Sequence, residues 1–220
     1  MFDNVDIRQV IVSFAAIVMS ITVHEFAHAI TADKLGDDTP RRHGRISLNP
    51  MVMFRAHPFG TLLVPLIGAF TGFLAGWAAT PVNPARVRRD ITVRQADIMI
   101  TAAGPISNVL FGLVSLVLYG ACVALQVHGG LAWMEPLVSL TGTLVLANAF
   151  LAVFNMLPVA PLDGFGIIKA YTGGRGKAVQ FLEQYGMLIL LVIIVKGGVI
   201  FTPVVKAVVG AMATVRGIVL

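Results

Sequence analysis

The chain has 220 residues, of which 57% are apolar and only 12% are charged, and its mean hydropathy is +0.86. A soluble domain carries about 25% charged residues, and so little polar surface cannot cover so much apolar surface, so we predict an integral membrane protein. This composition excludes a disordered chain, and a single cysteine, Cys122, excludes a disulfide-stapled secreted module. The net charge of +5 is typical of basic cytoplasmic loops in a membrane protein, so we expect no nucleic-acid partner.

Four segments reach the length of about 20 mostly apolar residues that a helix needs to cross the hydrocarbon core. They are residues 10–32, 61–80, 98–127 and 137–162. A fifth apolar run, residues 187–195, is shorter, and we expect one further crossing there, followed by a tail to residue 220. The sequence therefore predicts an all-α polytopic membrane protein, a transmembrane helix bundle with about four to five crossings. We expect residues 1–220 to form one domain, with its core at about residues 10–166.

The first apolar segment contains the sequence HEFAH at residues 24–28. On a helix, His24 and His28 lie one turn apart on the same face, where both can bind one zinc ion. Glu25 stands beside them and can take a proton from water. Ionisable groups at membrane depth are costly and usually functional, so a metal site is favoured over polar residues that are merely hydrogen-bonded inside a bundle.

Asp163 is the candidate for the third protein ligand that catalytic zinc requires. The remaining histidines lie in a charged loop or a glycine-rich turn, whereas Asp163 stands at the end of the fourth apolar segment. Pro158 and Pro161 precede it, and prolines end a helix and free backbone groups at a buried site. The alternative is that Asp163 is simply an N-cap after a proline-rich turn.

The sequence HEFAHA and the segment NMLPVAPLDG, residues 155–164, resemble the two hallmark motifs of the site-2 protease family of intramembrane zinc metalloproteases. The chain resembles the compact type, without a PDZ domain. Four shorter segments add to the similarity, which runs from about residue 20 to residue 166: GRISLNP at 44–50, GWA at 76–78, PVNP at 81–84 and AGPISN at 103–108.

The resemblance implies that His24, His28 and Asp163 bind one zinc ion per chain and that Glu25 is the general base. It implies hydrolysis of peptide bonds in or beside transmembrane segments of membrane-protein substrates, as in regulated intramembrane proteolysis. The expected partners are such a substrate and the lipid bilayer, and the oligomeric state stays open. The resemblance also suggests that Asn155 orients the reacting peptide.

Two further substrate contacts are considered. Asn108 lies early in the third apolar segment, where contact with substrate and a hydrogen bond between helices are equally plausible. Residues 44–49 alternate like a strand and would pair with an extended peptide by strand addition.

Two functions from other classes compete with proteolysis. The first is a catalytically silent zinc-binding membrane scaffold, against which the intact HExxH sequence and Asp163 argue. The second is a metal transporter, which more often spreads its ligands over several helices along a path. Here the candidate ligands converge on one compact site, so proteolysis is favoured.

The shared zinc site also predicts the membrane topology. If His24, His28 and Asp163 lie at one depth, the first and fourth segments run parallel, which requires an odd number of crossings between them. Residues 98–127 supply one crossing, so residues 61–80 are predicted to be re-entrant and to return on the side where they enter, or to lie as a broken helix or hairpin. The three loops that hold five, four and three Lys or Arg residues then share one face: 33–57, 81–97 and 163–183. We therefore expect a multi-pass cell-membrane protein with its active site nearer the cytoplasmic face.

Overall fold

The computed structural model describes residues 6–71, 76, 78–196 and 198–219, and this part of the chain is helical with no β-strand. Nine α-helices are described: α1 Ile7–Lys34, α2 Thr39–Arg42, α3 Pro50–Ala56, α4 Val64–Thr71, α5 Val93–His128, α6 Glu135–Asn155, α7 Asp163–Thr172, α8 Lys177–Lys196 and α9 Gly198–Val219. A π-helical turn at Phe59–Leu63 leads into α4, and 3-10 turns lie at Pro84–Arg86 and Ala132–Met134.

Five of these helices, α1, α5, α6, α8 and α9, are long and apolar enough to span a membrane. This confirms the predicted all-α polytopic bundle. The helices also begin before the apolar segments do, because polar residues cap their first turns. The Asp6 side chain accepts hydrogen bonds from the first turn of α1, and Thr92 and Gln95 form a capping box at the start of α5.

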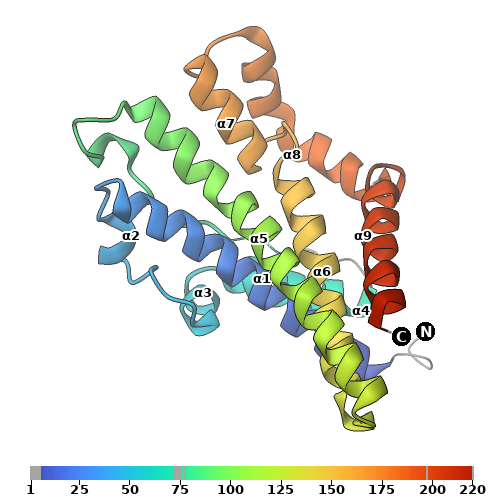
Figure 1. The fold of residues 1–220 in the computed structure, drawn as a ribbon. Helices are drawn as coiled ribbons and strands as arrows, with labels where there is room; N and C mark the ends of the chain where they lie inside the picture. The colour runs from blue at the N-terminus through green and yellow to red at the C-terminus, as the bar shows by residue number, and fades with distance from the viewer. Residues whose placement is uncertain (1–5, 72–75, 77, 197, 220) are drawn as a thin grey trace.

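The core of the bundle is made by α1, α5 and α6, which cross one another at the centre of the molecule (Figure 1). Ala16 of α1 and Ala147 of α6 are fully buried, and such small residues let the two helix backbones approach closely. Ile21 packs against Leu151 one turn further along. Polar side chains on the inward faces of these three helices consequently meet one another rather than lipid.

The segment between α3 and residue 80 contains the predicted re-entrant residues 61–80, and its two ends lie close together. At its start, His57 Nε2 lies 2.8 Å from the carbonyl oxygen of Ala79 at its end. The loops on either side also meet, since the Arg88 N–H donates to the carbonyl of Leu35 over 2.8 Å. The two ends therefore lie on one side of the bundle, while residues 72–75 and 77 of the predicted segment lie outside the described residues.

Helix α6 ends at Asn155, seven residues before the predicted end of the fourth segment, because Pro158 and Pro161 cannot continue a helix. The predicted tail is instead largely helical, since residues 198–219 form α9. An ion pair between Lys169 and Glu183 joins α7 to α8, and the end of α9 lies beside the end of α5. Together α8 and α9 therefore lead from the α7 end of the molecule to the other end (Figure 1).

Candidate metal centre

His24 and His28 project from adjacent turns of α1 into the core, as their spacing predicts. Their rings are 4.6 Å apart between centroids and meet edge to face, and their Nε2 atoms are 3.0 Å apart. Both side chains are buried, as is Glu25 between them. The pair therefore faces other protein elements and not the lipid.

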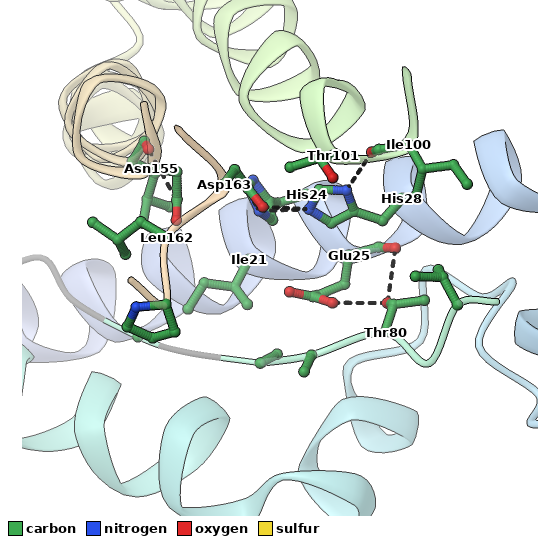
Figure 2. A pocket seen from close by; sticks show the side chains of 16 residues that line it. Ile21, His24, Glu25, His28, Thr80, Ile100, Thr101, Asn155, Leu162 and Asp163 are labelled. Atoms are coloured by element: carbon green, nitrogen blue, oxygen red, sulfur yellow. Dashed lines mark hydrogen bonds and ion pairs between the residues drawn. The ribbon is translucent and has the colours of Figure 1, made fainter. Parts of the chain in front are cut away.

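The loop after α6 brings Asp163 to the two histidines (Figure 2). Asp163 Oδ2 lies 3.2 Å from His24 Nε2, and Oδ1 lies 3.6 Å from His28 Nε2. Asp163 is the first residue of α7 and Leu162 is the N-cap, so the N-cap alternative does not describe this structure. The three candidate ligands therefore converge on one point, from two elements far apart in the sequence.

Hydrogen bonds on the far side of each imidazole fix which nitrogen carries the proton. His28 Nδ1 lies 2.7 Å from the carbonyl oxygen of Ile100, and His24 Nδ1 lies 2.7 Å from the side-chain oxygen of Asn108. Both partners are acceptors, so each Nδ1 donates, and in the neutral imidazole each Nε2 then presents a lone pair towards Asp163. Asp163 Oδ2 is buried and accepts no hydrogen bond, which agrees with this assignment. With both rings neutral, two lone pairs and a carboxylate converge on one point.

A zinc ion fits this donor set. Two imidazole nitrogens and one carboxylate are a common ligand set for catalytic zinc, and ligand atoms held tetrahedrally at about 2.05 Å from one ion lie roughly 3.3 Å apart. The two Nε2 atoms are 3.0 Å apart, and each lies 3.2 or 3.6 Å from one of the two Asp163 oxygens, close to that value. With one ligand atom taken from each residue, the three atoms lie within 4.8 Å of one another. A cation at the centre would also remove the repulsion between the lone pairs. The arrangement therefore has both the chemistry and the size of a three-ligand zinc site.

Helix α5 packs directly against the two histidine rings at Gly104. A Cβ atom placed on Gly104 would lie against the imidazole rings of both His24 and His28. Only a residue without a side chain lets α5 approach α1 so closely. Gly104 is therefore a requirement of the site that spacing arguments on α1 alone do not reveal.

Glu25 lies beside the histidines and borders a cavity of about 290 Å³ (Figure 2). The Thr80 hydroxyl donates to Glu25 Oε2 over 2.7 Å and lies 3.2 Å from the Glu25 backbone carbonyl. Residues 78–80 and 82, which lie outside any helix, line one wall of this cavity. None of residues 44–49 lines it, and they form no strand here, so their pairing with an extended substrate peptide stays a prediction.

The two candidate asparagines have different surroundings. Asn155 lines the cavity, and its Nδ2 donates to the carbonyl of Leu151 over 3.0 Å. Asn108 is fully buried behind His24 and does not line the cavity, so the structure has the interhelical hydrogen bond rather than a substrate contact. The sequence gives no local indication of the role of Thr80. Asn148 was also missed, although a polar residue inside an apolar helix is an indication of function.

Comparison with known proteins bears on the class of this site. The family model for peptidase family M50 matches residues 12–128. The chain is 34% identical over 196 residues to a Bacillus subtilis protein named "Putative zinc metalloprotease YwhC". The matched region covers 87% of this chain and 84% of that protein. Rip2 of Mycolicibacterium smegmatis carries the same description and is 27% identical, over 84% of this chain and 67% of its own length.

A third relative is longer. Rip3 of Mycobacterium tuberculosis, also named as a zinc metalloprotease, is 27% identical over 81% of this chain but only 36% of its own length. No solved structure gives a significant match to the chain. The family model covers more than half of the chain, and YwhC matches most of it, so this chain belongs to peptidase family M50, the site-2 protease family.

Proposed function

We propose that this chain is an intramembrane zinc metalloendopeptidase that hydrolyses peptide bonds in or beside the transmembrane segments of other membrane proteins. The observation that carries the proposal is the meeting of His24, His28 and Asp163 beside Glu25, inside a bundle of membrane-length helices. Membership of peptidase family M50 supports the reaction class. The biological process would be regulated intramembrane proteolysis.

In this proposal, His24, His28 and Asp163 hold one zinc ion per chain. When bound, zinc supplies Lewis acidity that polarises a carbonyl group and acidifies water. The Glu25 carboxylate takes the proton from the attacking water and delivers it to the leaving amine. Because Thr80 holds Oε2 of Glu25, we assign the proton transfer to Oε1.

The substrate has to enter as an extended peptide, since a hydrogen-bonded helix hides its carbonyl groups from a nucleophile. The cavity beside Glu25 is the place we assign to the reacting peptide bond. Asn155 is our candidate for orienting that peptide. Its Nδ2 is already bonded to α6, so its Oδ1 is the atom that would accept a hydrogen bond from a substrate N–H.

We assign the site to the cytoplasmic half of the membrane from the distribution of basic residues. The three basic loops lie at one end of the bundle, because Arg88 bonds to Leu35 and the Arg94 guanidinium lies 5.2 Å from the centroid of the Tyr171 ring. Lys and Arg residues concentrate in cytoplasmic loops of membrane proteins. In this proposal the chain is a multi-pass protein of the cell membrane. Its partners are the lipid bilayer and a transmembrane substrate.

The Glu25→Gln variant tests the mechanism, because it keeps the size of the side chain and removes the base. We expect the purified full-length variant to bind one zinc ion per chain, as measured by elemental mass spectrometry, and to lose at least 10²- to 10⁴-fold in cleavage rate. In cells, membrane proteins that accumulate uncut with this variant identify the substrates, and their cleavage sites should map to membrane segments. Retained proteolysis in the variant would contradict the assignment of Glu25.

The competing functions give different results in the same experiments. A silent scaffold would bind zinc, yet no membrane protein would differ in length between cells with the parent and cells with Glu25→Gln. A transporter would carry zinc into sealed vesicles reconstituted with the protein. We expect cleavage and no zinc flux.

A further inference from the structure

Three polar side chains lie at the centre of the bundle, behind the metal centre. Ser20 of α1, Asn108 of α5 and Asn148 of α6 each have 0% of their surface exposed. A buried amide or hydroxyl group costs free energy unless it is hydrogen-bonded, and the cost is highest where no water can reach. The bonds among these three residues therefore define a single arrangement.

The direction of these hydrogen bonds is set by backbone carbonyls. The Ser20 hydroxyl donates to the carbonyl of Ala16 over 2.8 Å, so its oxygen is left as an acceptor. Asn148 Nδ2 donates to that oxygen and to the carbonyl of Leu144, each over 2.9 Å. If the Asn148 amide were turned over, its oxygen would face the carbonyl oxygen of Leu144, which can only accept, so the observed orientation is the one that satisfies every group.

The same reasoning continues to the metal centre. Asn148 Oδ1 faces α5 and accepts from Asn108 Nδ2 over 2.8 Å, and the Ser20 carbonyl lies 3.3 Å from the same nitrogen. Asn108 Oδ1 is thereby turned to His24 Nδ1, 2.7 Å away. An acceptor at that position requires the proton of His24 to be on Nδ1, which leaves the lone pair on Nε2.

We propose that Asn148 and Ser20 are positioning residues that act through Asn108 to fix the tautomer and ring orientation of His24. The inference rests on the proposed zinc centre, because a neutral histidine binds a metal through the nitrogen that has no proton. Neither residue touches the cavity beside Glu25. Their effect reaches the metal through two successive side-chain amides.

Ser115 provides a matched control for Ser20. Both serines are fully buried, and the Ser115 hydroxyl donates to the carbonyl of Phe111 over 2.7 Å just as Ser20 donates to Ala16. Only Ser20 also accepts from Asn148. We expect Ser20→Ala in the full-length protein to weaken zinc binding about fivefold, the effect of one hydrogen bond, and Ser115→Ala to leave it unchanged. Equal effects of the two substitutions would overturn the proposal.

Asn148→Leu removes the link between Ser20 and Asn108. Loss of such outer partners weakens metal binding about 10- to 100-fold, and we expect this loss in a zinc competition titration with a chelator. In an Asn108→Leu background, Asn148→Leu should add less than twofold, because the relay is already broken. Fully additive losses would show that Asn148 acts independently of Asn108 and would overturn the proposal.

A second measurement separates this relay from the zinc site itself. In metal-free protein, the ring nitrogen NMR shifts of His24 should report the Nδ1–H tautomer in the parent and a mixture of tautomers in Asn148→Leu. A parent that binds no zinc but shows this change would refute the metal centre and support the relay. A parent that binds zinc while the His24 tautomer is the same in both proteins would refute the relay alone.

Discussion

The helices of the α1–α5–α6 core and of the α8–α9 pair are all long and apolar enough to span a membrane, yet the protein uses them differently. In the most apolar stretch of each helix, 56% of residues are buried in α1 and in the segment containing α6 and 33% in α5, against 11% in α8 and none in α9. The side chains of the candidate metal centre and its supporting asparagines lie on α1, α5, α6 and the first residue of α7. Hydropathy therefore says which helices can enter a membrane, whereas intramembrane polar groups say which of them pack together.

Adding one methyl group in each region tests most directly whether the core and the α8–α9 pair differ in their importance for the metal centre. Gly104→Ala would place a Cβ against both imidazole rings, whereas the Cβ of Gly210→Ala on α9 meets nothing within 4 Å. We expect Gly104→Ala to weaken zinc binding on the order of 100-fold, the upper end for changes beside metal ligands. Gly210→Ala should bind zinc normally and gain about 0.8–1.0 kcal/mol of helix stability at most. Zinc titration and thermal unfolding of the two full-length variants measure this difference.

Two threonines allow the same comparison between the site and α9 with the loss of a single hydroxyl group. Thr80 donates to the Glu25 carboxylate, whereas Thr214 on α9 donates only to the carbonyl of Gly210 in its own helix. Since a hydrogen bond to a charged group is the stronger kind, we expect Thr80→Val to lower kcat roughly tenfold without loss of zinc. Thr80→Ser should restore most of the rate, and Thr214→Val should match the parent. A Thr80→Val variant with full activity would contradict the role of this hydroxyl.

The smallest effect on the metal centre is expected from the best-packed contact of α9. Phe201 is 6% exposed, and its ring packs at a tilt against Phe150 and Phe154, with centroids 4.6 and 6.0 Å away. Phe201→Ala should destabilise the protein by about 3 kcal/mol in thermal or denaturant unfolding, while zinc affinity stays within about threefold of the parent. Val209→Ala, at a half-exposed position, is the control and should change neither quantity. A large loss of zinc binding in Phe201→Ala would show that α9 supports the site as strongly as the core does.

The prediction for residues 61–80 combined the hydropathy pattern with a chemical constraint, the shared depth of the candidate ligands. Residues 61–80 have the length and composition of a crossing, and hydropathy alone assigns one. If Asp163 meets the HExxH helix at one membrane depth, a crossing there is not expected, and the described helix at Phe59–Phe70 is among the shorter apolar ones. The contacts of His57 with Ala79 and of Leu35 with Arg88 agree with the return. The expected path of residues 61–80 therefore came from the need for an odd number of crossings between the two ligand-bearing segments, and not from hydropathy.

The sequence by itself determined the features that depend on local geometry. Residues four apart on a helix share a face, so His24 and His28 meet wherever α1 packs, and Pro158 and Pro161 end α6 before Asp163 in any environment. The class of fold, the two histidine ligands and the candidate base were accessible for this reason, because each follows from spacing or composition within a short stretch of chain. Asp163 was instead indicated by elimination and by the resemblance of residues 155–164 to a family motif.

Only the tertiary structure decided the partners that orient these residues. Asn108 is 84 residues from His24 in the sequence, Thr80 is 55 residues from Glu25, and Asn148 is 128 residues from Ser20. Whether such side chains meet depends on the register and rotation of packed helices, where a shift of one residue turns a side chain by about 100° around the helix. Asn108 was consequently ambiguous in the sequence, and it is the packing of α5 between α1 and α6 that places it behind His24 instead of in the cavity.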